Sequence, residues 1–233
     1  MEYQGNELEI FNQAKNWKAY FSKQILSFIW GDVLEVGAGI GANIPYLYNE
    51  NVKSWTSLEP DTKFVSKIKE TYPHIQVVEG TLDALKEKKY DTVLYLDVLE
   101  HISDDNEEFK KAANMVRPSG NLIIQCPAHN YLFSPFDQAI GHYRRYNKSM
   151  YKMLVSDSLE LVKLRYLDSL GLTLSLGNSL ILKSSMPTLK QVLFWDKVII
   201  PISRILDPLV AYLFGKAIVG VWRKKSDKKT SVN

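Results

Sequence analysis

Three glycines recur at short intervals directly after an apolar run near the start of the chain. The stretch 33–43 reads VLEVGAGIGAN, in which Gly37, Gly39 and Gly41 follow four residues of strand-forming character. Glycine lets the backbone turn tightly and approach a ligand where a Cβ would collide. A helix starting directly after the turn would add unpaired N–H groups. The spacing predicts a ligand-binding loop between a strand and a helix.

Two kinds of ligand fit this loop. Gly37, Gly39 and Ala42 match the dinucleotide fingerprint G-x-G-x-x-G/A, and Glu59 follows at the distance of a ribose-binding acid. A pyrophosphate is negative and suits a helix N-terminus, whereas S-adenosylmethionine carries an ammonium and a sulfonium. The carboxylate of Glu35 suits those cations better, which favours S-adenosylmethionine. The alternative is that Glu35 only orders the glycine turn by hydrogen bonding.

The elements that must position these residues alternate between strand and helix. One or two helices are predicted over 8–29. Strands are predicted at 32–36, 54–58, 75–78, 92–96, 121–125, 161–168 and 218–223, and helices from about 43, over 61–71, over 106–116 and from about 148. A helical insertion of about 25 residues is expected before the last strand. This rhythm predicts an α/β fold with a Rossmann-like, doubly wound, mostly parallel sheet.

Composition is that of one sizeable domain. The 233 residues are 45% hydrophobic, and we expect a single domain over 1–233, with a helical cap (1–30), a cofactor-binding core (31–127) and a substrate-side part (128–233). The net charge of +3 is small and much of the basic excess lies in 223–229, so no nucleic-acid partner is expected. The single cysteine, Cys126, excludes an internal disulfide and fits a reducing cytoplasm. With no signal segment and no long apolar run, we expect a soluble cytoplasmic protein.

Four motifs in order make the chain similar to a known family. They are 34–41 (LEVGAGIG), 57–60 (SLEP), 90–102 (YDTVLYLDVLEHI) and 116–124 (VRPSGNLII). With them the sequence resembles the class I S-adenosylmethionine-dependent methyltransferases of the type 11 and 12 domain group, strongly over 30–127 and weakly elsewhere. The resemblance implies a seven-stranded sheet whose antiparallel last strand lies between the fifth and sixth. It also implies S-adenosylmethionine as cofactor and S-adenosylhomocysteine as product.

The resemblance further implies the cofactor contacts. Gly37 and Gly39 would pass beneath the methionine portion, and the two oxygens of Glu59 would accept the ribose hydroxyls. The acid that the family uses for adenine is replaced by Thr81, so the ring contact falls to Thr81 and Leu82 or to Asp83, which could instead cap a short helix over 84–86. The full predicted set is Glu35, Gly37, Gly39, Gly41, Glu59, Thr81, Leu82 and Asp97.

Candidate catalytic groups follow the fourth strand and fill the segment after the fifth. His101 is a candidate base, and the alternative is that it braces its loop. The segment 127–146 ends in GHYRRY, and similar bacterial methyltransferases carry a very similar stretch. We predict His142 and Tyr143 as catalytic candidates. His129, Arg144 and Arg145 are predicted to bind the acceptor; the alternative is that the arginines pair with Asp137 or Glu100 and pin the loop. Because the four histidines are scattered in sequence, no metal is expected.

An apolar segment near the C-terminus departs most from a minimal methyltransferase. Phe194, Trp195, Ile199 and Leu206 form a stripe that would cover the sheet or make a homodimer interface. The alternative is that 189–222 rests on a membrane surface or admits a lipid-linked acceptor. The sequence thus predicts methyl transfer from S-adenosylmethionine to a small-molecule or lipid- or glycan-type acceptor. The alternatives are an NAD-dependent oxidoreductase and a non-catalytic S-adenosylmethionine-binding module.

Overall fold

The computed structural model describes residues 6–85, 88–181 and 187–226. Within these residues seven strands form one sheet in the order β3-β2-β1-β4-β5-β7-β6. The strands are β1 (Gly31–Val36), β2 (Val52–Glu59), β3 (Gln76–Glu79), β4 (Tyr90–Leu96), β5 (Val116–Pro127), β6 (Leu159–Leu167) and β7 (Ala217–Lys224). Strand β7 is antiparallel to both of its neighbours, while β1 to β5 are parallel. The predicted fold, with its inserted last strand, is confirmed.

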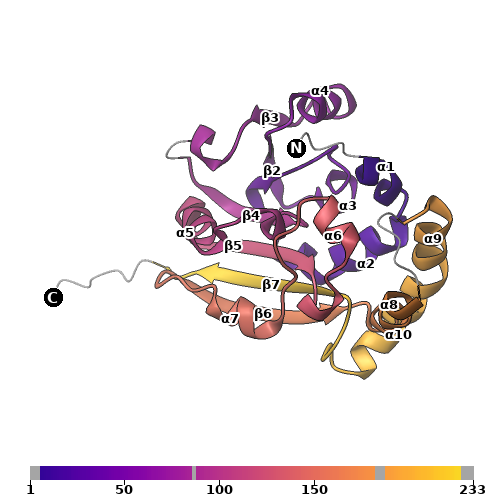
Figure 1. Ribbon diagram of the computed structural model, residues 1–233. Coiled ribbons are helices and arrows are strands. Elements are labelled where there is room, and N and C mark those ends of the chain that lie inside the picture. The colour runs from indigo at the N-terminus through magenta and orange to yellow at the C-terminus, as the bar shows by residue number, and fades with distance from the viewer. Residues whose placement is uncertain (1–5, 86–87, 182–186, 227–233) are drawn as a thin grey trace.

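Helices lie on both faces of this sheet (Figure 1). The helices, with their bounds, are α1 (Asn6–Asn12), α2 (Lys15–Ile25), α3 (Ile44–Leu47), α4 (Thr62–Thr71), α5 (Asp105–Met115), α6 (Pro135–Ala139), α7 (Lys148–Met153), α8 (Ser169–Ile181), α9 (Leu189–Phe194) and α10 (Ile200–Leu209). Short 3-10 turns are η1 (Leu26–Phe28), η2 (Leu82–Leu85), η3 (Leu99–His101) and η4 (Asn130–Leu132), and η5 (Trp195–Ile199) is a π-helical turn that joins α9 to α10.

Alternation along the central strands explains the two layers. In β1, Leu34 and Val36 pack in a core with α5 and α7, whereas Val33 packs on the other face with α2, α3 and α10. Successive side chains of a strand point to opposite faces, so one strand supplies both cores. Because both faces are covered, the central strands β1 and β4 are buried almost throughout, as expected of a parallel sheet, whereas the edge strands β3 and β6 carry exposed residues.

Four local predictions differ from the structure. The helix after the glycine loop is a single turn, α3, with Pro45 at its start. The short helix predicted at 84–86 is the 3-10 turn η2, which starts at Leu82. Two short helices, η4 and α6, interrupt the predicted loop after β5. The insertion before the last strand begins with α8 at Ser169, so it is longer than the predicted 25 residues.

Buried carboxylates hold the insertion against the rest of the protein. Asp207 of α10 accepts hydrogen bonds from the Tyr20 hydroxyl (2.6 Å) and from the backbone N–H groups of Asp168 (2.7 Å) and Ser169 (2.9 Å). Asp196 accepts from the N–H groups of Asn16 and Trp17. These acids therefore have a structural role, because hydrogen-bond donors compensate each buried carboxylate. No helix in the described parts of the chain has the length and hydropathy needed to cross a bilayer.

Candidate active site

The glycine loop turns at the carboxyl edge of the sheet, between β1 and α3. Gly37 and Gly39 have φ of +63° and +55°, in the left-handed region that side chains disfavour. A Cβ on Gly37 would lie 2.7 Å from the Val98 side chain. The N–H of Gly37 donates to the Leu58 carbonyl at 2.8 Å, which joins the loop to the next strand. The loop is thus held close to the ends of β2 and β4.

Glu59, the last residue of β2, is fixed beside this loop. Its Oε2 accepts from the Gly39 N–H at 2.7 Å and its Oε1 from the Asp61 N–H at 3.0 Å. Burial raises its pKa, although the two backbone donors oppose the rise. A carboxylate held in this way at the edge of the sheet is suited to a ligand that offers hydroxyl groups.

Glu35 lies underneath the loop and is fully buried. Its Oε1 accepts from the Asn43 amide at 3.1 Å. Its Oε2 has no hydrogen-bond partner at normal geometry, although the Trp55 indole N–H is close enough to favour the carboxylate. Burial raises the pKa of Glu35 to about 7. The bond to Asn43 agrees with the alternative that Glu35 orders the glycine turn by hydrogen bonding. The second carboxylate oxygen, which lacks a partner, is the atom that would contact a cationic group of the cofactor.

Asp97 follows β4 with a φ of +56°. Its Oδ1 accepts from the Gln125 amide at 2.9 Å, and its N–H donates to the Gln125 carbonyl. Solvent reaches Asp97, yet desolvation by the surrounding protein raises its pKa, and the hydrogen bond from Gln125 and the charge of Lys18 oppose that rise. Lys18 of α2 is itself buried, which lowers its pKa to about 8. An acid and a base from distant segments therefore share this edge of the sheet.

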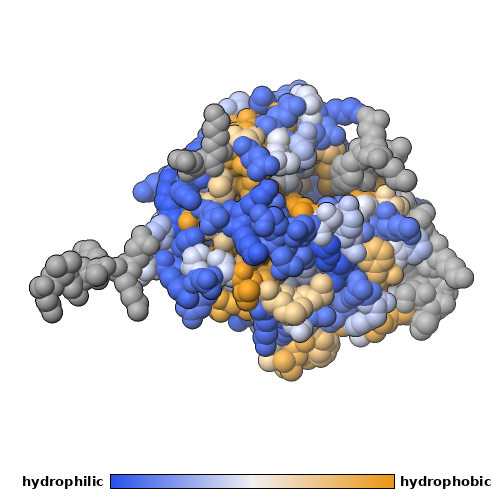
Figure 2. Space-filling model, turned by 60° about the vertical axis from the view of Figure 1, so that its left-hand side comes forward, coloured by the Kyte–Doolittle hydropathy of each residue, from blue (hydrophilic) through white to orange (hydrophobic). Residues whose placement is uncertain are grey.

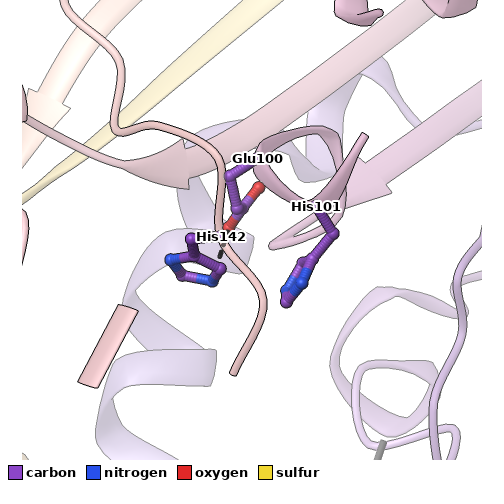
Figure 3. Close-up of side chains that lie close together, drawn as sticks. All are labelled: Glu100, His101 and His142. Atoms are coloured by element: carbon purple, nitrogen blue, oxygen red, sulfur yellow. Dashed lines mark ion pairs between the residues drawn. The ribbon is translucent and has the colours of Figure 1, made fainter. Parts of the chain in front are cut away.

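Glu100, His101 and His142 converge (Figure 3), and the charge of Asp97 acts on Glu100. The first two come from η3 and the third from the loop after α6. The two imidazole rings meet edge to face with centroids 4.5 Å apart, and Nε2 of His142 lies 3.9 Å from Oε1 of Glu100. Burial lowers the pKa of His101 to about 4 and raises that of Glu100 well above its usual range. The backbone of Ile140 and Gly141 hydrogen bonds to His101.

Asp137 of α6 is the anchor of the loop that carries His142. It accepts from the Arg145 guanidinium through Nε and Nη2, both at 2.8 Å, and pairs with Nδ1 of His142 at 2.9 Å. The N–H and hydroxyl of Ser134 also donate to it. Burial alone would raise the pKa of Asp137, but the bonds from His142 and Arg145 outweigh it and hold the pKa well below the usual range.

Both predicted arginines are engaged with protein groups. Arg145 is buried against Asp137, while Arg144 donates to the carbonyls of Ile102 and Ser103 and pairs with Asp105 at 3.0 Å. Arg145 thus makes the pair with Asp137 that the loop-pinning alternative named, whereas Arg144 pairs with Asp105, and acceptor binding by either arginine stays a prediction.

The remaining predicted residues lie around this centre. His129 stacks on Tyr131 and Tyr166, and burial lowers its pKa. Tyr143 is 60% exposed, and its N–H donates to the Glu100 carbonyl. Leu82 is buried and Thr81 exposed at the end of β3. Asp83 lies inside η2, 3.5 Å from Lys111, so it is not the helix cap.

Lys18 is the group at the site that the sequence analysis did not find, because it lies within an amphipathic helix, whereas Glu100 entered only as a possible partner of the arginines. A lysine whose position falls on the buried face of a helix is a signal that could have marked Lys18. Nothing in the sequence brings Glu100, His101 and His142 together, because the third lies 41 residues beyond the second.

The sheet order, the glycine loop and the acid after β2 define a class I, Rossmann-like methyltransferase domain. Residues 34–124 match the family model described as a methyltransferase domain. This domain is of the S-adenosylmethionine-dependent class, as are the relatives that it resembles. The family predicted from the four sequence motifs is confirmed.

Known relatives cover part of the chain. A tRNA U34 carboxymethyltransferase of Pseudoalteromonas atlantica is 29% identical over 99 residues, which are 40% of this chain and 31% of that protein. A probable S-adenosylmethionine-dependent methyltransferase of Mycobacterium tuberculosis is 29% identical over 108 residues, 45% of this chain and 38% of that protein. The aligned regions thus cover about a third of the length of these relatives. In fold, the chain is similar over 95% of both chains to a structure from the complex between the Haloferax volcanii Trm112 methyltransferase activator and a methyltransferase (TM-score 0.65, 12% identity).

Proposed function

We propose that this protein transfers the methyl group of S-adenosylmethionine to a hydroxyl or amine of a small or lipid-linked acceptor. The observation that carries the proposal is the pairing of Gly39 with Glu59. It holds a buried carboxylate, with its pKa raised by burial, directly beside a glycine turn at the carboxyl edge of the sheet. In doubly wound folds that edge is where nucleotide-type ligands bind.

The charges along this edge suit the two ends of the cofactor. Glu59 would exchange its contact with Gly39 for the ribose hydroxyls. Asp97 and Lys18, which attract each other, would face the ammonium and the carboxylate of the methionine portion. Two opposite charges presented together fit a zwitterionic amino acid better than a pyrophosphate, which carries negative charge alone.

Methyl transfer is an in-line displacement in which positive charge on sulfur disperses, so orientation of the acceptor supplies much of the acceleration. A hydroxyl or ammonium acceptor must also lose a proton. His101 is neutral at physiological pH because burial lowers its pKa to about 4, and it lies against His142. We infer that this histidine pair receives the acceptor at the methyl-facing side. Tyr143, exposed on the same loop, would contact the acceptor.

Isothermal titration with S-adenosylmethionine, S-adenosylhomocysteine and NAD tests the cofactor. We expect micromolar binding of the two adenosyl compounds and no binding of NAD. Glu59→Ala should weaken S-adenosylhomocysteine by about 2–4 kcal/mol, since two charge-assisted hydrogen bonds are lost. Glu79→Ala is a matched control, because that acid ends the neighbouring strand and bonds Thr62 instead. Binding of NAD alone would establish the oxidoreductase alternative.

A lipid-linked acceptor is favoured by the surface of α9 and α10. The predicted stripe divides: Ile199 is buried in the core, whereas Phe194 is 56% exposed. Further exposed apolar side chains are Leu189, Val198, Ile202, Ile205 and Leu209. Figure 2 shows a hydrophobic area at the lower edge of the molecule.

Charge on the same helices strengthens this inference. Asp196 and Asp207 are buried, whereas Lys190, Lys197 and Arg204 are exposed. Folding therefore removes the acids from the surface and leaves apolar and basic groups, a combination that binds anionic lipid.

Co-sedimentation with vesicles containing phosphatidylserine tests the membrane contact. We expect binding that weakens in Phe194→Ser/Ile205→Ser and persists in Val155→Ser, an exposed apolar position on another face. Absence of binding to anionic vesicles, with a dimer in ultracentrifugation, would assign the face to self-association instead.

A further inference from the structure

Glu100 is a buried carboxylate that lacks the donors buried acids normally have. It is 0% exposed, and neither of its oxygens has a nitrogen or oxygen hydrogen-bond donor at normal geometry. The N–H of Glu100 itself and the thiol of Cys126, a weak donor, lie beside the carboxylate and favour its charged form. Two other buried acids, Asp137 and Asp207, are by contrast each surrounded by donors. Glu100 therefore lacks the compensation that a buried negative charge requires.

Two imidazoles are aimed at the same point. One ligand atom each from Glu100, His101 and His142 can be chosen so that all lie within 4.8 Å of one another. Asp137 is ionised, so a neutral His142 keeps its proton on Nδ1 and turns the lone pair of Nε2 toward Glu100. His101 is likewise oriented by the backbone at Ile140 and Gly141. Carboxylate or carbonyl groups behind imidazoles are the usual support of metal-binding histidines.

We propose that Glu100, His101 and His142 bind a divalent transition-metal ion. Two imidazoles and one carboxylate are a ligand set typical of Zn²⁺ and Fe²⁺, whereas Mg²⁺ and Ca²⁺ prefer oxygen alone. A positive ion at this point would also offset the neighbouring carboxylates of Asp97 and Asp137, which repel the charge of Glu100.

The ligand atoms, which lie within 4.8 Å of one another, must move closer together to bind an ion. In a tetrahedral site with bonds of about 2.1 Å the ligand atoms are about 3.4 Å apart. The Nε2 to Oε1 distance of 3.9 Å between His142 and Glu100 is already close to that value. Gly141, with φ of +84°, precedes His142 and lets the loop approach the other two ligands. His101 is half-buried, whereas the side chain of His142 is only 6% exposed.

The ion would have a defined use in the proposed reaction, and this part rests on the proposed function. Three protein ligands leave a coordination position for an acceptor oxygen. On coordination the O–H proton would leave to water, the O–CH₃ bond would form, and the pair of the broken S–C bond would stay on sulfur. The histidines would then be ligands that position the acceptor, and neither would serve as a base.

Metal binding is measured on the full chain, freed of tag and stripped with EDTA, without cofactor. Zn²⁺ is titrated against a chromophoric chelator, and Co²⁺ is followed by its visible absorption. We expect one Zn²⁺ per chain with micromolar or tighter affinity. His101→Ala and His142→Ala should each weaken it at least about 100-fold, and Asp137→Asn about 10–100-fold, as outer-shell partners do.

His74→Ala is the matched control, because His74 is exposed and its ring contacts the rings of Tyr48 and Tyr72 edge to face. It should change Zn²⁺ affinity less than twofold. Circular dichroism and S-adenosylhomocysteine affinity report folding of each variant. A wild type that binds S-adenosylhomocysteine but no stoichiometric Zn²⁺ would overturn the metal site and leave the proposed function standing. Equal losses in His74→Ala and His142→Ala would overturn it as well. Stoichiometric Zn²⁺ without cofactor binding would support the site and reject the function.

Discussion

Replacement of Asp137 by Asn should strongly destabilise the protein, because one carboxylate holds the whole loop after β5. Asparagine has the same shape as aspartate, but its NH₂ group would face donors that in the wild type bond to a carboxylate oxygen. The variant also leaves Arg145 buried without a counter-charge. Breaking one side of a buried ion pair costs about 3–5 kcal/mol. For a chain of this size each kcal/mol lowers Tm by about 2–4 °C, so we expect a decrease of about 6–20 °C.

The assay is thermal and urea unfolding in EDTA at pH 7, with Asp83→Asn as the matched control. Asp83 is 77% exposed and 3.5 Å from Lys111, so the same substitution there should cost less than about 0.5 kcal/mol. The pair Asp137→Asn/Arg145→Met should be more stable than the sum of the single variants predicts, since no unpaired charge remains. Equal shifts for Asp137→Asn and Asp83→Asn, or strict additivity in the double variant, would refute the anchoring role.

The structure determines the direction in which the contribution of Asp137 to folding stability changes with pH. The pKa of Asp137 in the folded protein lies well below its value of about 3.9 in an unfolded chain. Its contribution is therefore complete above about pH 4 and is lost as the pH falls further. The stability difference between wild type and Asp137→Asn should be constant from pH 8 to 5 and shrink below pH 4.

Two further predictions concern other buried acids. Glu35 has a pKa of about 7 when folded against 4.5 ordinarily, so stability should fall as the pH rises through this window. Glu35→Gln should abolish that fall and be more stable at pH 8 by up to about 3 kcal/mol; urea midpoints at pH 4 and 8 check this, and an equal loss at both would contradict it. Asp207→Ala should cost about 3 kcal/mol or more, because the Tyr20 hydroxyl and two N–H groups lose their acceptor. Thermal melts against Asp157→Ala, an exposed acid, measure it, and a small loss would show that water replaces the carboxylate.

Much of the fold followed from local pattern. Apolar runs of strand length predicted all seven strands, because side chains buried in a sheet are mostly apolar. Helical periods separated these runs, and glycine and proline marked the turns between them. Strand β5 begins earlier than predicted, because Val116 pairs with Tyr90 and Asn121 with Thr92, and residues 117–120 bulge out between these two pairs. The short elements η4 and α6 were missed, since a turn or two of helix carries too few residues for a period to appear.

The candidate site likewise contains parts that local sequence spacing predicted and parts that it did not. The sequence by itself determined the glycine loop and Glu59, because they lie on consecutive segments whose spacing is fixed by one βαβ unit. Only the tertiary structure decided that Arg144 and Arg145 pair with Asp105 and Asp137, that Asp196 and Asp207 leave the surface, and that Glu100, His101 and His142 meet. Those relations depend on which distant segments pack together, and that choice is made by the burial of many side chains at once, which no local spacing encodes.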